Sequence, residues 1–362
     1  MRNDKLPGLD GLRAIAVALV LLFHRYLLPV GWLGVQIFFV LSGYLITRIL
    51  ARSKAQPLGD YLRNFYGRRA LRIFPLYYAV IVLLCLATAA GAKLTGVRAG
   101  LPFAATYTYN FWYATKASGY SLFITHFWTL CVEEQFYLVW PFVMYLCPPR
   151  HTKRLLFGLI AIGPLLRLAG TWLLAQPHAT ALPDPSVALD VLTTTHLDAF
   201  ATGACFALFP WGGAPRALLL LAFAWLAAGA ALVVTRHLPW ASLGYPIGMA
   251  PGYGYLWGYT LINCSSGLLI DCLVNRRFLP AFFELRPLAY LGRISYGLYV
   301  IHYPMQAIAD RALPHAAFSV RLGFQIVATV ACASASFHFW EAPFLRFKDR
   351  WFRGSRTVSV DI

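Results

Sequence analysis

Two ionisable side chains lie in the first apolar segment of this sequence, Gly11-Leu-Arg-Ala-Ile-Ala-Val-Ala-Leu-Val-Leu-Leu-Phe-His24. Arg13 and His24 are almost three helical turns apart, so both project from one face, about 16 Å apart along the axis. Ionisable groups in a membrane helix usually face a bundle interior or a water-filled path and mark function. An imidazole there suits general-base or nucleophilic chemistry. The alternative, a structural ion pair or hydrogen bond, accounts better for one isolated residue than for an aligned pair.

A second pair, Arg69 and Arg72, lies in the segment Gly67-Arg-Arg-Ala-Leu-Arg-Ile-Phe-Pro75, at the predicted cytoplasmic entrance of a span. Residues three apart share a helix face. Two guanidinium groups on one face suit phosphate recognition, because each offers a planar fork of donors. Anchoring by positive charge at the cytoplasmic surface is the alternative. It explains Arg72 less well, since that residue already lies inside the predicted span.

Two adjacent carboxylates, Glu133 and Glu134, interrupt an apolar run that ends at Pro141. They cannot both face lipid without a large cost in free energy. Tyr137 follows them by four and three residues, so it can share a face with either. One glutamate could orient a histidine for general-base chemistry, and the other could pair with an arginine.

Three further places allow both a functional and a structural explanation. His302, near the outer end of a later span, is a weaker candidate, because a lone histidine there is more often a hydrogen-bonded structural group. His196 and Asp198 are ambiguous in the same way. The long connection 91–127 is aromatic and suits either stacking on sugar rings or the aromatic belt at the membrane surface, which we favour. Its aromatic residues include Tyr107, Tyr109, Phe111, Trp112, Tyr113 and Tyr120.

The composition indicates a membrane protein with several spans. Of 362 residues, 59% are hydrophobic and only 12% are charged, about half the charged fraction of a soluble domain. The net charge of +17 comes from basic residues at the ends of spans, so it favours membrane orientation and anionic lipid over nucleic acid as a partner. The seven cysteines lie in apolar segments without zinc-site spacing, so we interpret them as small buried hydrophobes and expect no metal. The amino-terminal segment resembles a signal peptide but lacks a cleavage site, and we expect it to stay as the first helix.

Hydropathy predicts an all-α integral membrane protein with about ten transmembrane helices. The predicted spans are 9–28, 32–51, 71–90, 127–146, 155–174, 196–209, 217–234, 255–274, 288–309 and 322–339. Basic residues gather in alternate connections and in the tail, whereas the connection 175–195 has no lysine or arginine. This alternation predicts that both termini are cytoplasmic. We expect one membrane domain over 5–345, followed by a short basic cytoplasmic tail over 346–362.

The order of these motifs resembles the membrane-bound acyltransferase-3 family over nearly the whole chain. The matching motifs are Asp10-Gly-Leu-Arg13 with His24, Gly34-Val-Gln-Ile-Phe-Phe-Val-Leu-Ser-Gly-Tyr44, Arg69-Ala-Leu-Arg72, Trp128 to Pro141, Ser295-Tyr-Gly-Leu-Tyr-Val-Ile-His302 and Glu341-Ala-Pro-Phe344. The resemblance implies ten core helices and transfer of an acyl group, usually acetyl, from cytoplasmic acyl-CoA to a hydroxyl. The acceptor is commonly an envelope glycan; an O-antigen, an exopolysaccharide, a lipid-linked sugar and a small secondary metabolite all stay open. A multi-pass protein of the bacterial inner membrane is the expected setting.

Carried over by position, the resemblance implies that His24 is the catalytic histidine and that Arg13, Arg69 and Arg72 belong to the functional arginines. We expect the CoA nucleotide near Arg69 and Arg72, with its pantetheine arm directed toward His24. The imidazole would act as general base or accept the acyl group transiently. Glu133 or Glu134 would hold its tautomer, and the oxyanion donor is unassigned, with Arg13 and Tyr137 as candidates.

The chain departs from the family's pattern at Thr129 and Cys131, where serines are frequent. Threonine keeps a hydroxyl, whereas a thiol is a weak donor, so a substrate-positioning role is in doubt at Cys131. Some members also carry a soluble esterase-like domain after the membrane part. This chain ends soon after the last predicted span, so we expect the membrane core to complete the transfer or to hand the group to a separate protein.

A transporter or proton-coupled permease is the alternative function, since buried arginine, histidine and glutamate are equally natural there. No internal repeat pairs the two halves of the sequence, and the ordered motifs favour the acyltransferase. A receptor or scaffold without turnover leaves the buried ionisable residues unexplained.

Overall fold

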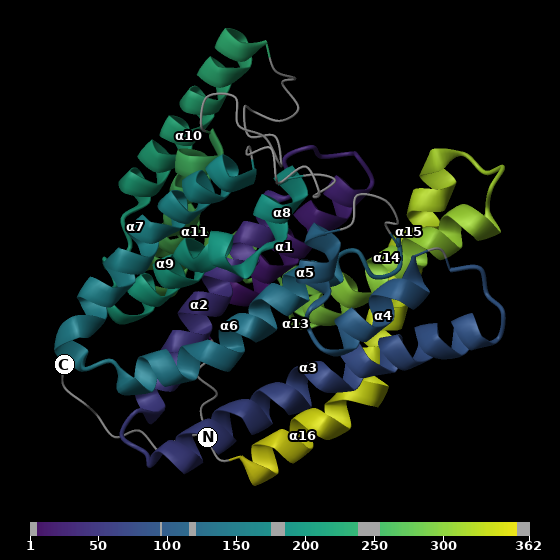
Figure 1. Ribbon diagram of the computed structural model, residues 1–362, viewed down its shortest axis with the longest axis horizontal. Coiled ribbons are helices and arrows are strands. Elements are labelled where there is room, and N and C mark those ends of the chain that lie inside the picture. Colours follow the sequence, from purple (N-terminus) through teal and green to yellow (C-terminus); the bar gives the residue numbers. More distant parts are fainter. Residues whose placement is uncertain (1–5, 95, 116–120, 175–184, 238–253, 353–362) are drawn as a thin grey trace. The chain divides into compact units, whose positions relative to one another are not determined.

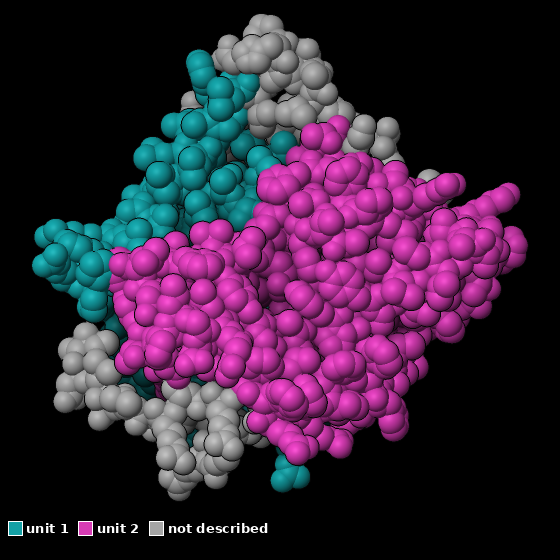
Figure 2. Space-filling view, turned by 60° about the horizontal axis from the view of Figure 1, so that its bottom comes forward, with its two compact units in different colours: residues 1–48, 148–295 teal, residues 49–147, 296–362 magenta. Residues whose placement is uncertain are grey.

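The computed structural model describes residues 6–94, 96–115, 121–174, 185–237 and 254–352, and these ranges are helical, with no strand among them (Figure 1). The chain forms two compact units, coloured separately in Figure 2. Unit 1 comprises residues 1–48 and 148–295, and unit 2 comprises residues 49–147 and 296–362. The predicted all-α class is therefore confirmed.

Unit 1 begins with α1 (Leu9–His24) and most of α2 (Leu33–Ser53) and continues after a long excursion of the chain. Its later helices are α7 (Pro149–Leu174), α8 (Pro185–Val191), α9 (Leu197–Leu208), α10 (Pro215–Arg236), α11 (Gly254–Arg276), α12 (Pro280–Phe283) and α13 (Arg286–Arg293), with a 3-10 turn at Thr193–His196. Glycines allow these helices to approach closely. A Cβ at Gly43 of α2 would collide with the Phe200 carbonyl of α9, and one at Gly203 would collide with the Val40 carbonyl. Such small-residue contacts are typical of helices packed within a membrane.

A buried ion pair holds the centre of unit 1. The guanidinium of Arg167 donates from Nη1 to Oδ1 of Asp198 at 3.0 Å and from Nη2 to Oδ2 at 2.8 Å. Nη1 also donates to the Thr195 carbonyl at 2.6 Å. Arg167 is 3% exposed and Asp198 1% exposed. The pair therefore ties α7 to α9 and to the turn before it, in the two-pronged geometry that suits arginine and carboxylate.

Unit 2 is built on the long helix α3 (Leu58–Ala89). Its other helices are α4 (Val97–Ala105), α5 (Tyr109–Ala114), α6 (Phe127–Leu146), α14 (Ser295–Ala312), α15 (Phe318–Ala335) and α16 (Ala342–Trp351), with a π-helical segment at Ser336–Glu341 between the last two. Helix α16 lies along the first half of α3 (Figure 1), and the ring of Phe352 covers Gly67. The imidazole of His126, just before α6, hydrogen-bonds the Val300 carbonyl of α14 at 3.1 Å.

Within the described ranges, five helical segments are long and apolar enough to cross a membrane: Leu33–Ser53, Leu58–Ala89, Pro149–Leu173, Pro215–Arg236 and Phe318–Lys348. Each overlaps a predicted span, and the predicted span 127–146 has the bounds of α6. The full count of ten and the orientation of the termini stay predictions. Part of the predicted basic tail, residues 353–362, lies outside the described residues.

Three predicted boundaries are wrong as helix boundaries. Helix α1 ends at His24, not at Leu28. Helix α3 begins at Leu58, not at Leu71, because its basic first half forms helix readily although hydropathy rejects it. The predicted span 288–309 is interrupted at Ile294, between α13 and α14.

The cysteines are all free, as expected from their spacing, but they are not all buried. Cys131, Cys205 and Cys272 are buried, whereas Cys85 of α3 and Cys332 of α15 are exposed. Exposed apolar side chains are natural on helices that face lipid, so an apolar segment alone does not reveal which side is interior.

Asp198→Asn is expected to destabilise the protein strongly, because it leaves the charge of Arg167 buried without a carboxylate, a loss of about 3–5 kcal/mol. The measurement is the thermal midpoint of the purified protein in detergent. The double change Arg167→Met with Asp198→Leu is expected to recover most of the loss. Arg277→Gln, which removes the exposed ion pair with Glu284 at 2.7 Å, serves as the control and is expected to leave the midpoint unchanged. A double variant as unstable as Asp198→Asn would contradict this account.

Candidate functional site

Arg13 and His24 both lie on α1 of unit 1. Nη1 of Arg13 donates to Oδ1 of Asp10, one turn earlier, at 3.4 Å. His24 is the last residue of the helix. The chain then turns sharply, with Tyr26 in the left-handed region at φ 58°. His24 is thus the end of a rigid element, and its ring lies 5.5 Å from that of Phe23.

The remaining predicted site residues belong to unit 2, where Arg69 of α3 lies against α6. Its guanidinium carbon is 4.9 Å from the centre of the Tyr137 ring, a cation–π contact. Tyr137 is 5% exposed, so its ring is a fixed platform. Arg69 also lies within electrostatic reach of the Glu134 carboxylate. Glu134 in turn interacts electrostatically with the neighbouring Glu133. The tyrosine predicted to contact a substrate therefore holds an arginine in place.

Arg72 lies within electrostatic reach of a different carboxylate. It interacts electrostatically with Glu341, in the π-helical segment, and with Tyr296 of α14. Glu341 is 7% exposed and accepts a hydrogen bond from Oγ of Ser336 at 2.8 Å. A π-helical insertion is frequently found at functional sites. In the sequence, Glu341 stands out only as part of a late family motif; a lone carboxylate directly after an apolar span is the signal that points to it.

Several tyrosines lie within electrostatic reach of Glu134, and two of them, Tyr77 and Tyr296, are not expected from the sequence as site residues. Tyr77, Tyr107 and Tyr296 all interact electrostatically with this carboxylate. Tyr77 donates to the Ala104 carbonyl at 2.7 Å, and Tyr296 donates to the Ile73 carbonyl at 2.8 Å. Tyr77 lies five residues after Arg72 on α3, about 140° further round the helix, so the spacing of the paired arginines gave no signal for it.

Tyr107, assigned to the aromatic belt from the sequence, instead packs inside unit 2. Its ring stacks on that of Tyr77 at 4.5 Å with 14° between the planes. Its backbone is in the left-handed region at φ 54°, which is unfavourable for a bulky residue. Gln135 of α6 fixes this conformation, since its Nε2 donates to the Tyr107 carbonyl at 2.8 Å and to Oδ1 of Asn110 at 2.9 Å. The Tyr107 hydroxyl is buried and has no hydrogen-bond partner in the described part of the chain.

The two departures from the family's pattern, Thr129 and Cys131, are interior positions. The Thr129 hydroxyl donates to the His126 carbonyl at 3.0 Å and is 2.6 Å from the Tyr299 hydroxyl. Cys131 is fully buried, beside the backbone of Tyr109 and Asn110. Both side chains are engaged within unit 2, so the thiol at position 131 occupies a packing position.

The three weaker candidates are buried structural groups. His302 is fully buried, and its Nδ1 donates to the Tyr299 carbonyl of its own helix at 2.5 Å. His196 donates from Nε2 to the Asp190 carbonyl at 2.7 Å, and its Nδ1 lies 3.3 Å from Nε2 of Gln36. Asp198 belongs to the ion pair with Arg167.

Unit 2 therefore brings together two arginines, the carboxylates within electrostatic reach of them, and several tyrosines. Guanidinium groups of this kind can bind phosphate, and a carboxylate among hydroxyls can orient or exchange a proton. Among the described residues, no three His, Cys, Asp or Glu side chains are grouped so that they could hold a metal ion.

The helices define the class as an all-α protein with several candidate membrane spans. Within this class, the chain belongs to the acyltransferase-3 family: the model of its acyltransferase domain matches residues 6–339.

Curated relatives agree with this assignment. The chain is 28% identical over 351 residues to the peptidoglycan O-acetyltransferase OatA of Listeria monocytogenes, an alignment covering 93% of this chain and 55% of the relative. It is 29% identical over 359 residues to the O-acetyltransferase OatA of Staphylococcus aureus, covering 93% of this chain and 57% of the relative. The chain thus spans about half the length of the curated relatives it matches. No solved structure matches it.

The contact between Arg69 and Tyr137 is expected to appear as an energetic coupling of about 0.5–1 kcal/mol in a double-mutant cycle of Arg69→Ala and Tyr137→Leu, followed by thermal unfolding. Tyr137→Phe keeps the aromatic face and is expected to retain the coupling. The matched control pairs Tyr137→Leu with Arg68→Ala, because Arg68 instead donates to the Phe352 carbonyl. Additive effects of Arg69→Ala and Tyr137→Leu would contradict the contact.

Proposed function

We propose that this chain transfers an acetyl group from cytoplasmic acetyl-CoA to a hydroxyl of a cell-envelope glycan. The observation that carries the proposal is the family match over residues 6–339, together with paired arginines held by aromatic and acidic partners. The names of the relatives favour peptidoglycan as the glycan. Lipopolysaccharide, exopolysaccharide and lipid-linked sugars are the alternative acceptors.

Arg69 and Arg72 bind the phosphates of the CoA nucleotide in this proposal. Both lie on α3, three residues apart, and each guanidinium offers a planar fork of donors that suits a phosphate. Tyr137 supports the first arginine from beneath its plane. Glu341 balances the charge of the second before the donor binds.

His24 is the catalytic residue that we propose. As a general base, its imidazole takes the proton from the acceptor hydroxyl while the hydroxyl oxygen attacks the thioester carbonyl. The carbon–sulfur bond then breaks, and the CoA thiolate takes the proton from the imidazolium. Transient acylation of the imidazole, followed by attack of the hydroxyl on the acyl-imidazole, is the second route. Glu133 or Glu134 holds the imidazole tautomer, and Arg13 or Tyr137 is the candidate donor to the oxyanion.

The setting that we propose is the bacterial inner membrane, with about ten spans and both termini cytoplasmic. The basic connections between spans support this orientation. It places the segment that carries Arg69 and Arg72 toward the compartment that contains acyl-CoA.

His24→Ala is expected to abolish transfer, because neither route works without the imidazole. Membranes containing the protein are given acetyl-CoA labelled in its acetyl group, and label in glycans and lipids is followed together with release of free CoA. His315→Ala, in the connection between α14 and α15, is the control and is expected to transfer at the wild-type rate. Transfer by His24→Ala at that rate would overturn the catalytic assignment.

Arg69→Gln and Arg72→Gln are each expected to raise KM for acetyl-CoA about tenfold, the loss of one charge-assisted phosphate contact. The adjacent Arg68→Gln is the matched control, and its KM is expected to stay unchanged. Initial rates over a series of acetyl-CoA concentrations separate KM from kcat. An unchanged KM in both arginine variants would show that acetyl-CoA binds at another place.

A further inference from the structure

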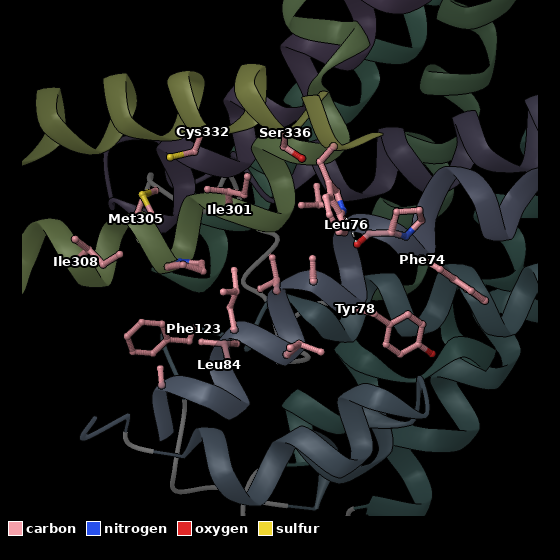
Figure 3. Close-up of a pocket in the computed structure, with 18 of the residues that line it drawn as sticks. Phe74, Leu76, Tyr78, Leu84, Phe123, Ile301, Met305, Ile308, Cys332 and Ser336 are labelled. Atoms are coloured by element: carbon pink, nitrogen blue, oxygen red, sulfur yellow. Dashed lines mark hydrogen bonds between the residues drawn. The ribbon is translucent and has the colours of Figure 1, made fainter. Parts of the chain in front are cut away.

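An apolar groove of about 1260 Å³ runs along one side of unit 2 (Figure 3). Its walls are α3 on one side and α14, α15 and the π-helical segment on the other. Figure 3 shows Met305 and Cys332 on one wall and Leu84 and Phe123 across from them. None of the predicted site residues lines it. A groove of this size on an apolar surface is a ligand-binding feature that the acetyl-transfer proposal leaves unused.

The groove is long enough to exceed one leaflet of a bilayer. It follows α3 from Ala70 to Ala87, about 26 Å at the helical rise per residue. The hydrocarbon core of a bilayer is about 30 Å thick, so the chains of an ordinary phospholipid reach about 15 Å. A single occupant that fills the groove therefore needs an apolar chain much longer than that of a phospholipid.

The wall formed by α3 alternates small and large side chains. Ala79, Leu83 and Ala87 follow one another at steps of four residues, so they form one row on the helix with a leucine between two alanines. Such a wall has recesses between its bulky side chains. It fits a branched chain better than a straight saturated one.

Arg311, the one charged residue that lines the groove, lies in the last turn of α14. Its guanidinium carbon is 5.0 Å from the centre of the Phe123 ring, and Nη1 donates to the Ala307 carbonyl at 3.4 Å. The neighbouring Asp310 pairs with Arg321 at 3.6 Å instead. The guanidinium of Arg311 thus packs against an aromatic ring and has no carboxylate partner in the described chain. Such a cation suits a phosphate.

The opposite end of the groove, at Ala70, Trp340 and Phe344, has no charged lining residue. A pair of phospholipids entering from the two membrane surfaces would find a cation at only one end. One lipid with one anionic head and one long branched chain matches both ends.

We propose that this groove binds a polyprenyl phosphate, with its isoprenoid chain along α3 and its phosphate at Arg311. Resting on the proposed function, the inference names the substrate class: the lipid carries the glycan acceptor on its phosphate. The charge pattern of the connections places the Arg311 end outside the cytoplasm. Acyl transfer to a glycan on this carrier changes neither the phosphate nor the chain.

The test uses the full chain in nanodiscs of phosphatidylethanolamine and phosphatidylglycerol, with a polyprenyl phosphate that carries a photoreactive group on its chain. After irradiation, labelled peptides are expected from α3, α14 and α15. Cys332→Trp fills the groove from an exposed lining position, and Arg311→Gln removes the cation; each is expected to lower labelling about tenfold. Excess phosphatidylglycerol is expected not to compete.

Matched controls separate specific binding from ordinary lipid contact. Val327→Trp, at an exposed position of the same helix that does not line the groove, and Arg98→Gln, at an exposed arginine of α4, are expected to label as the wild type does. Labelling spread over all apolar faces, full competition by phosphatidylglycerol, or equal loss in test and control variants would overturn the proposal.

The same measurement with His24→Ala distinguishes the two proposals, since labelling requires no acetyl-CoA and no turnover. If the groove is labelled but even the wild-type protein transfers no acetyl group, the lipid site is supported and the proposed function is overturned. Acetyl transfer to a glycan with diffuse labelling would remove the lipid site alone.

Discussion

The cost of placing charge in an apolar interior governs this structure. A chain with few charged residues keeps some of them inside helices, and each needs a partner that offsets lost hydration. Arg167 obtains two oxygens of Asp198 and three further acceptors, at Thr195, Leu256 and Thr260. Arg69 obtains an aromatic face and a nearby carboxylate. The first arrangement gives both terminal nitrogens of the guanidinium protein acceptors and joins helices, whereas the second packs a guanidinium against an aromatic face.

The helices of unit 2 are adapted to hold that second arrangement. Pro75 lies inside α3, and its carbonyl accepts a hydrogen bond from Nε1 of Trp340 at 2.9 Å. The π-helical segment contains Glu341, which lies within electrostatic reach of Arg72. Gln135 fixes the turn at Tyr107 and so keeps the tyrosines stacked. Irregular backbone within a membrane domain needs such internal partners, because lipid supplies none.

One helix separates two kinds of surface in unit 2. Arg69 and Arg72 of α3 take part in the polar site, whereas Phe74, on another side of the same helix, lines the apolar groove. An acyltransferase with a water-soluble donor and a lipid-borne acceptor needs both surfaces. Helical periodicity allows a single segment to supply them, since residues three or four apart share a face and intermediate ones do not.

The sequence by itself determined the all-α class, the places of several spans and the family, because apolar runs and the order of the motifs Arg13…His24, Arg69…Arg72 and Glu133-Glu134 are local patterns. It also indicated that His302 and Asp198 allow a structural explanation. Only the tertiary structure decided which groups lie near each charge: Asp198 pairs with Arg167, Tyr137 packs against Arg69, and Glu341 lies within electrostatic reach of Arg72. It also moved Tyr107 from the predicted belt to the interior and showed that Cys332 is exposed. These pairings join residues far apart in the chain, and hydropathy registers only that a side chain is polar, not which neighbour packing brings to it.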